Sequence, residues 1–228
     1  MVLTIHHLQV SQSERVPWLC EELGIAYELV LHKRAPIFSP QSIKDLNPVG
    51  QAPVIQDDSL RLAESAACIE YIIHKYGGGR LSLAPSHKDY AAYLYWFHFA
   101  NGTFQPLLMV FMQVMRLDKD GQMLKGYSDR FENLLKIVDQ RLGETHAYLA
   151  GEEFTAADIM ILFTLTTMRY FCGYDLTDYK GILEYLQRCS DREGYRNARA
   201  KADPDLGFAI DAEAPRSFVE SLKEQGKL

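Results

Sequence analysis

The first 80 residues alternate between short apolar runs and segments whose apolar residues fall on one face of a helix. The short runs are bounded by polar or turn residues, and they predict strands at residues 3–8, 27–31, 53–56 and 60–63. The longer segments predict helices at residues 13–23 and 65–76, with a shorter helical stretch that ends near Leu46. Gly24 ends the first helix. This order predicts a small α/β unit of the form βαβ followed by a hairpin and a helix.

The second half of the chain has no strand pattern. Three glycines at residues 77–79 and then Pro85 interrupt the periodicity, and we place a domain boundary there. Helices are predicted at residues 90–117, 123–149, 155–171 and 182–192. Thr155 and Asp158 have the spacing of a capping box, which gives Asp158 a structural role. We therefore expect a domain at residues 1–80, an all-helical domain at 86–202 and a polar C-terminal tail at 203–228.

Composition narrows the classes of function. The net charge of −6 and the absence of a Lys/Arg run argue against nucleic acid or an anionic membrane as a partner. The longest apolar stretches are too short to cross a bilayer, and no signal peptide is visible at the N-terminus. The four cysteines lie far apart without zinc spacing, which predicts reduced thiols in a cytoplasmic protein. Because His6 and His7 alternate faces on a strand, we expect no metal site.

One pair of motifs carries most of the chemical information: Gly50-Gln51-Ala52-Pro53 and, shortly after, Glu64-Ser65. A proline at the start of a strand cannot donate to the sheet, so backbone groups of Ala52 are left for another partner, and a cis bond before Pro53 is expected. Serine is a favoured N-cap residue, and an uncovered helix N-terminus attracts a carboxylate. These features predict a site for an extended peptide with a free carboxylate.

Together with residues 18–24 and 154–158, these motifs resemble the soluble glutathione transferase family. The segments His-His-Leu at 6–8 and Ser-Gln-Ser-Glu-Arg at 11–15 are most similar to its fungal and bacterial members. The resemblance covers about the first 200 residues. It implies an N-terminal thioredoxin-like βαβαββα domain that binds glutathione, followed by a C-terminal all-helical bundle domain with the pocket for a second substrate.

The resemblance also implies an activity. Glutathione is the expected co-substrate, and its thiolate is expected to be conjugated to a small hydrophobic electrophile, in detoxification or secondary metabolism. Two alternatives use the same site: a glutathione-dependent isomerase or eliminating enzyme, and a non-catalytic regulatory module that binds glutathione. Members of the family are usually homodimers, and we expect the same here.

The sequence offers three candidates for stabilising the thiolate. A thioredoxin-like half without a CxxC motif must use a bound thiol, whose pKa of roughly 8.5 must fall by selective stabilisation of the thiolate. Family members place a Tyr, Ser, Cys or Asn between the first strand and the first helix. Here Ser11 is favoured, followed by Ser13 and then by Gln12 or backbone amides. Either serine would serve equally well as a helix cap.

For the rest of glutathione, the resemblance assigns one residue to each part. The backbone of Ala52, held by Pro53, pairs with the cysteinyl unit, and Gln51 reaches the glycyl carboxylate, with help from the basic loop at 33–34. Ser65 takes the γ-glutamyl carboxylate, and Glu64 takes the ammonium group of the same unit.

The second-substrate pocket is expected in the helical half, along a run of aromatic and flexible apolar residues between 93 and 112. Most of this run is expected to be core. We assign Trp96, Phe97 and Asn101 to the pocket, and Asn101 is notable as a polar residue in an apolar run.

Overall fold

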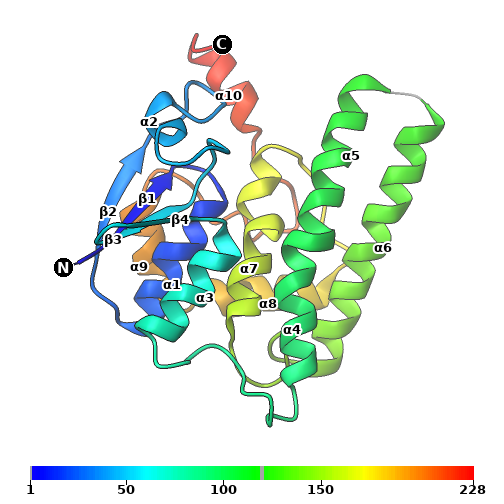
Figure 1. Ribbon diagram of the computed structural model, residues 1–228. Coiled ribbons are helices and arrows are strands. Elements are labelled where there is room, and N and C mark those ends of the chain that lie inside the picture. Colours follow the sequence, from blue (N-terminus) through cyan, green and yellow to red (C-terminus); the bar gives the residue numbers. More distant parts are fainter. Residues whose placement is uncertain (1, 119–120) are drawn as a thin grey trace.

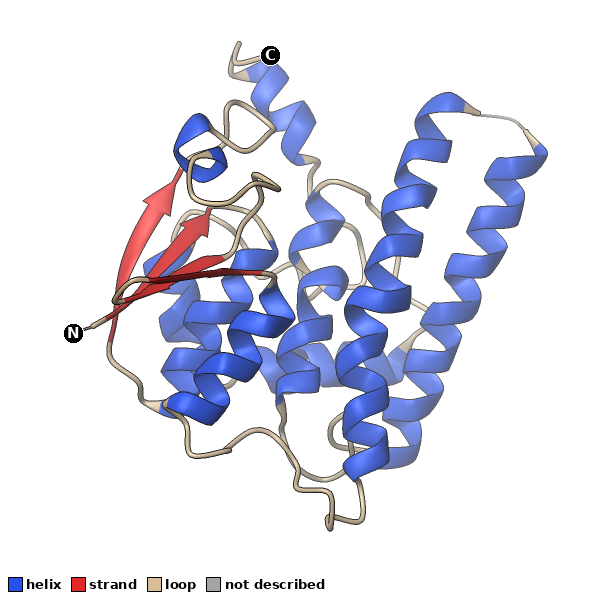
Figure 2. Ribbon diagram, viewed as in Figure 1, coloured by secondary structure: helices blue, strands red, loops and turns tan. Residues whose placement is uncertain are grey.

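The computed structural model describes residues 2–118 and 121–228, and its four strands form one sheet at one side of the molecule (Figures 1 and 2). The strands are β1 (Leu3–Leu8), β2 (Tyr27–His32), β3 (Val54–Asp57) and β4 (Leu60–Ala63). They lie in the order β2-β1-β3-β4, with β2 parallel to β1 and the other two pairings antiparallel. This mixed sheet, with helices before and after the hairpin, is the predicted thioredoxin-like arrangement.

Alternating side chains of β1 direct helices to the two faces of the sheet. Leu3 and Ile5 belong to the main core, which includes buried residues of α1 (Arg15–Leu23) and α3 (Ser65–Lys75). Leu8 has the opposite parity, and it packs instead with Ile43 of α2 (Gln41–Lys44) and with Ala52. After β1, the chain continues through residues 9–11 into the 3₁₀ turn η1 (Gln12–Glu14), which leads directly into α1.

The remaining elements that the structure describes are helical and pack beside this unit (Figure 1). They are α4 (Tyr90–Phe99), the π-helical turn η2 (Ala100–Phe104), α5 (Gln105–Leu117), α6 (Gln122–Thr145), α7 (Ala156–Leu165), the 3₁₀ turn η3 (Thr167–Tyr170), α8 (Lys180–Ser190), α9 (Glu193–Ala202) and α10 (Phe218–Glu224). Every residue of α7 is buried, so it forms the centre of the helical half. The fold-class prediction is confirmed.

The capping box predicted at the start of α7 is present. The Thr155 hydroxyl accepts from the amide of Ala157, and the Asp158 carboxylate accepts from the amide of Thr155 at 2.9 Å. Asp158 also accepts from the amide of Leu149 and from the hydroxyl of Tyr185. The carboxylate therefore ties together α7, α8 and the chain before α7, which is the structural role expected of it.

Two helices were missed by the sequence analysis. The segment that forms α9 is mostly polar, and its buried stripe consists of Tyr195, two small alanines and the charged Arg199, so the apolar period is weak. The tail contains α10, and it is held to the helical half because buried Arg169 donates to the carbonyls of Ala209, Asp211 and Ala212. The tail therefore returns to the end of β1 and supplies part of the wall of a cavity there.

The predicted helix at 90–117 is a continuous helical segment with one departure, the π-helical turn at Ala100–Phe104. Such turns occur often at functional sites. No helix among the described residues is both long and apolar enough to span a bilayer.

Candidate glutathione site

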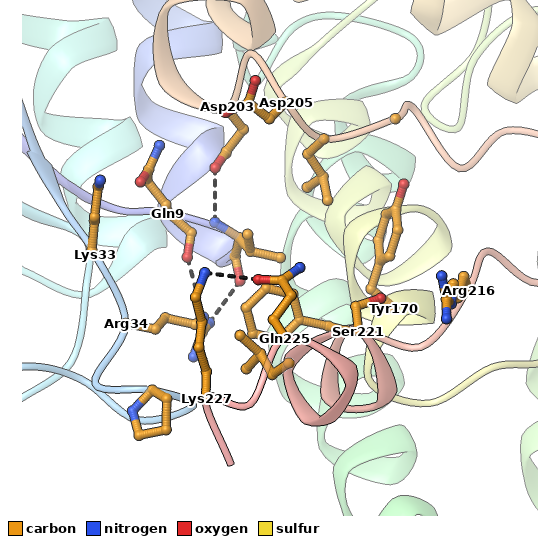
Figure 3. Close-up of a pocket in the computed structure, with 16 residues that line it drawn as sticks. Gln9, Lys33, Arg34, Tyr170, Asp203, Asp205, Arg216, Ser221, Gln225 and Lys227 are labelled. Atoms are coloured by element: carbon orange, nitrogen blue, oxygen red, sulfur yellow. Dashed lines mark hydrogen bonds between the residues drawn. The ribbon is translucent and has the colours of Figure 1, made fainter.

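Residues of the loop that follows β1 line two separate cavities. The larger, of about 660 Å³, is lined by Gln9 and Val10, by residues 33–36 after β2, by Tyr170, and by parts of the chain between 203 and 227 (Figure 3). The smaller, of about 10 Å³, is lined by Gln12, by Gln51, Ala52 and Pro53, by Glu64 and by neighbouring residues. Val10 lines the larger cavity and Gln12 the smaller one, and Ser11 is the residue between them in the chain.

The two candidate serines differ in how much of their surface is exposed and in their hydrogen bonds. Ser13 is fully buried, and its hydroxyl oxygen accepts from the amide of Leu8 at 3.0 Å and lies 2.8 Å from Nδ1 of His7. Ser11 retains 6 % of its surface, and its hydroxyl lies 2.7 Å from both the Leu8 carbonyl and the Ser13 hydroxyl. It also accepts from the amide of Ser13, as the N-cap of η1. Ser11 therefore acts as a cap and is the more accessible of the two hydroxyls.

The third candidate, Gln12, lines the small cavity and reaches across to the backbone of Ala52, just before β3. Its Nε2 donates to the Ala52 carbonyl at 3.2 Å, and its Oε1 accepts from Nε2 of Gln105 at 2.9 Å. The backbone group that the resemblance assigns to the cysteinyl unit is therefore occupied by a side chain of the protein itself. The Ala52–Pro53 bond is cis, as expected.

Ser65 lies at the start of α3, but its predicted role as N-cap is wrong. The helix begins at Ser65 itself, and the cap position is Glu64, which has a φ of 72° and makes no side-chain cap bond. The buried Ser65 hydroxyl instead accepts from Nη1 of Arg15 at 3.0 Å and from Nδ2 of Asn101 at 3.1 Å. A positive φ at a residue other than glycine is uncommon, and here it falls on a predicted ligand residue.

Arg15 is the centre of a buried polar cluster that joins the two halves of the chain. Its guanidinium donates to Ser65, to Oδ1 of Asn101 at 2.9 Å and to Oε1 of Gln105 at 2.9 Å. Burial lowers its pKa to about 9, although the charge of Glu14 acts in the opposite direction. The positive charge of the Arg15 guanidinium lies 3.0 Å from the Ser65 hydroxyl oxygen. The N-terminus of α3 is therefore a favourable place for a carboxylate.

The π-helical turn explains how Asn101 and Gln105 reach this cluster. Asn101 lies within the turn, and Gln105 is the first residue of α5 beyond it. Both contact Arg15, so the helical half presents two amides to α1. Asn101 therefore lies beside Ser65 and away from the larger cavity.

The other two residues predicted for the second-substrate pocket lie in the core. Trp96 is 5 % exposed and Phe97 is 1 % exposed, and both belong to the main hydrophobic cluster. Neither lines the two cavities described above. Their assignment stays a prediction, whereas the larger cavity is an alternative pocket that the sequence analysis did not find.

The basic loop after β2 contributes one well-fixed residue. Arg34 donates to the carbonyls of Gln9, Val10 and Ile37, and burial lowers its pKa to about 10. Figure 3 shows Arg34 and Asp203 reaching the same loop from different sides. Arg34 thus fixes the backbone between the two cavities, while Lys33 lines the larger one.

Sequence reasoning did not assign roles to Arg15, Gln105, His7 or Asp203. Arg15 lies on the apolar face of the helix predicted at 13–23, and a charged residue in that position is a signal of a buried polar contact. Asp203 lies 196 residues from its partner His7, so no local pattern could join them. Among the described residues, no group of three or more His, Cys, Asp or Glu side chains could hold a metal ion.

Comparisons with known proteins agree with this geometry. Residues 11–75 match the family model described as Glutathione S-transferase, N-terminal domain, and residues 122–188 match the corresponding C-terminal domain. Glutathione S-transferase 3 of Schizosaccharomyces pombe is 30% identical over 220 residues, which cover 89% of this chain and 88% of that protein.

Solved structures show the same architecture. A glutathione S-transferase from Actinobacillus pleuropneumoniae has a TM-score of 0.80 at 27% identity, over 92% of this chain and 99% of that one. A glutathione transferase of Phanerochaete chrysosporium, solved with oxidized glutathione, has a TM-score of 0.67 at 20% identity, over 87% and 94%. The family models match both halves of the chain, the fold agrees with the solved structures, and the chain belongs to the glutathione S-transferase family.

Proposed function

We propose that the protein binds glutathione along the surface formed by residues 51–53 and by Glu64 and Ser65, beside the small cavity, and conjugates its thiolate to an apolar electrophile held in the larger one. The observation that carries this proposal is that one short loop supplies a lining residue to each cavity, Val10 to the larger and Gln12 to the smaller. A nucleophile and an electrophile bound on either side of Ser11 meet without a large movement of the protein. Family membership supports glutathione as the co-substrate.

The γ-glutamyl unit of glutathione is placed at the start of α3. The two hydrogen bonds to Ser65 from Arg15 and Asn101 leave the hydroxyl proton of Ser65 free to donate to a carboxylate. The buried guanidinium and the helix N-terminus both favour the negative charge. Glu64, the residue before Ser65, takes the ammonium group. This end of the site binds and orients the peptide, and it does not contact the reacting sulfur.

The cysteinyl unit pairs with the backbone of Ala52, next to Pro53, in the manner of an added strand. This pairing requires Gln12 to release the Ala52 carbonyl, to which it now donates. The released amide then lies beside the incoming thiol, where it can donate to the thiolate together with Ser11. Gln51 and the basic residue Lys33 are placed near the glycyl carboxylate.

The electrophile is placed in the larger cavity. Its apolar wall includes Val10, Tyr170 and Phe218, and its basic residues include Lys33 and Arg216. Such a cavity suits an apolar molecule of moderate size, and most of its far wall comes from the tail. The tail is therefore expected to control which electrophiles are accepted.

The two alternative functions use the same geometry. An isomerase or eliminating enzyme would return the thiol at the end of its cycle, and a regulatory module would bind glutathione without turnover. Incubation with glutathione and a panel of electrophiles separates the three. A conjugate that consumes thiol supports the transferase, altered substrate with unconsumed thiol supports the isomerase, and binding without turnover supports the module.

The placement of the electrophile is tested by Phe218→Ala, with the exposed Phe38→Ala as the matched control. We expect Phe218→Ala to raise the KM for the electrophile and to leave the KM for glutathione unchanged, whereas Phe38→Ala should change neither. An unchanged KM for the electrophile in Phe218→Ala would place it elsewhere, for example near Trp96 and Phe97.

We further propose a cytoplasmic homodimer that acts in detoxification or secondary metabolism, with domain boundaries at 1–80, 86–202 and 203–228. The four cysteines are all free and buried, which suits a reducing compartment. The exposed apolar residues Leu94 and Tyr95 on α4 and Val110 on α5 suit a surface that is covered in a dimer.

A further inference from the structure

Four buried side chains form a continuous series of hydrogen bonds from Ser11, after β1, to Asp203 at the start of the tail. The Ser11 hydroxyl lies 2.7 Å from that of Ser13, which lies 2.8 Å from Nδ1 of His7. Nε2 of the same imidazole lies 2.9 Å from Oδ2 of Asp203. His7 and Ser13 are fully buried, and the other two are nearly so. The contacts proposed above for glutathione do not require this series of hydrogen bonds.

The carboxylate at one end sets the direction of the hydrogen bonds. Burial acts to raise the pKa of Asp203, but its hydrogen bond to His7 and the nearby positive charge of Arg199 hold it below the usual value. An ionised carboxylate only accepts, so Nε2 of His7 carries a hydrogen and donates it. In the neutral imidazole Nδ1 is then an acceptor, and it receives the hydroxyl hydrogen of Ser13.

The same carboxylate also fixes the loop that presents Ser11. Oδ1 of Asp203 accepts from the amide of Val10 at 2.9 Å, and Arg34 donates to the Val10 carbonyl at 2.6 Å (Figure 3). Val10 has a φ of 57°, a backbone conformation that a β-branched residue rarely adopts. Contacts on both sides therefore hold a strained residue directly before Ser11. The geometry couples the position of Ser11 to the state of Asp203.

We propose that Asp203, His7 and Ser13 form a proton relay that accepts the thiol proton of glutathione through Ser11. This inference rests on the proposed function, because it requires the thiol to lie at Ser11. The S–H bond breaks as an O–H bond forms on Ser11. Ser11 turns its own hydrogen from the Leu8 carbonyl, to which it now donates, and passes it to Ser13, and Ser13 passes its hydrogen to Nδ1 of His7. The products are a thiolate and an imidazolium, so charge is conserved and no other reactant is needed.

The relay leaves every group with a partner. Ser11 now directs its new hydrogen at the thiolate, and Nδ1 of His7 donates to Ser13. The imidazolium is held against the Asp203 carboxylate, as in the Ser-His-Asp arrangement of hydrolases. Ser11 is the catalytic residue of the relay, because it is the one member of the four that touches the sulfur, and the other three act through it.

The charged and titratable groups around the relay come from several elements. Glu14 of η1 interacts electrostatically with both His7 and Asp203. Arg199 of α9 and Arg34 after β2 interact with Asp203, and His32 at the end of β2 interacts with His7. Water has little access to this region, since both His7 and Ser13 are fully buried. The group that stabilises a proton on His7 is the Asp203 carboxylate, 2.9 Å from Nε2.

Proton retention can be measured directly. Glutathione is added to the full-length protein near neutral pH in weak buffer. Thiolate is counted by its ultraviolet absorbance, and released protons are counted with a pH indicator. We expect the wild-type protein to form thiolate while it releases far less than one proton per thiolate. Release of one proton per thiolate would overturn the relay.

Asp203→Asn is the first variant, with Asp205→Asn as the matched control, because Asp205 is an exposed acid that lines the same cavity. An asparagine amide donates to Nε2 of His7, which moves the hydrogen to Nδ1, so the relay can no longer accept. We expect release to approach one proton per thiolate and the apparent thiol pKa to rise by about one unit, or tenfold less thiolate at a given pH. Asp205→Asn should match the wild type in both readouts.

Ser13→Ala keeps the proposal testable if Asp203→Asn does not fold. It cuts the chain between Ser11 and His7 and leaves the His7–Asp203 pair in place, so it should reproduce the same two changes. Wild-type proton release and thiolate titration in either folded variant would overturn the relay. If calorimetry shows no glutathione binding to the wild-type protein, the relay and the proposed function both fail, whereas binding with full proton release overturns the relay alone.

Discussion

Replacement of Ser65 by alanine tests the γ-glutamyl end of the site through two separate quantities. The first is stability. The Ser65 hydroxyl is buried, and it accepts from the guanidinium of Arg15 at 3.0 Å and from the amide of Asn101 at 3.1 Å. A hydrogen bond from a charged donor is worth about 1.5–3 kcal/mol and a neutral one about 1 kcal/mol. The free energy of unfolding of Ser65→Ala should therefore fall by about 2–4 kcal/mol.

The second quantity is affinity for glutathione. Because the hydroxyl oxygen already accepts two bonds, its proton is the group offered to the γ-glutamyl carboxylate. Loss of one hydrogen bond to a charged group, again about 1.5–3 kcal/mol, corresponds to binding about 10- to 150-fold weaker. The carboxylate is remote from the sulfur, so the interaction is equal in the ground and transition states. We therefore expect KM for glutathione to rise while kcat stays close to the wild-type value.

Calorimetric titration with glutathione and denaturant unfolding measure the two effects. Ser190→Ala is the matched control, since Ser190 is 2 % exposed but donates only to the Gln187 carbonyl of its own helix, at 3.0 Å. It should lose about 1 kcal/mol or less of stability and keep wild-type affinity. Unchanged affinity in Ser65→Ala would refute the placement of the γ-glutamyl carboxylate. A stability loss no larger than that of Ser190→Ala would refute the argument from the Arg15 cluster.

Three further predictions follow from the packing. Burial raises the pKa of the Cys20 and Cys68 thiols to about 12, and Cys172 and Cys189 are equally buried. A thiol reagent near neutral pH should therefore label none of the four cysteines in the folded protein and all four after unfolding. Asp158→Asn replaces an acceptor by a donor in the capping box, so the free energy of unfolding should fall by about 2–4 kcal/mol. Denaturant titration measures this loss, and the KM for glutathione should be unchanged. Sedimentation at micromolar concentration should show a species of twice the 26.0 kDa chain mass, and a monomer would contradict the dimer proposed from the exposed apolar residues of α4 and α5.

The sequence alone was sufficient for the elements whose signals are local. The strands at the N-terminus, the stop at Gly24 and the capping box of Thr155 and Asp158 all depend on residues a few positions apart. The glutathione motifs are local as well, and they identified the correct family before any contact was known. The failures also have local causes: α9 has a weak apolar stripe, and Ser65 was taken for a cap because serine favours that position.

Tertiary structure alone decided the contacts that complete the site. Arg15 meets Ser65, Asn101 and Gln105, which lie 50, 86 and 90 residues away. His7 meets Asp203 across 196 residues, and the wall of the larger cavity comes largely from a tail that the sequence marked only as polar. Buried polar groups must find partners, but no sequence pattern specifies which distant partner packing supplies. The sequence determined the family to which the chain belongs, and the packing of its two halves determined which residues lie together at the candidate site.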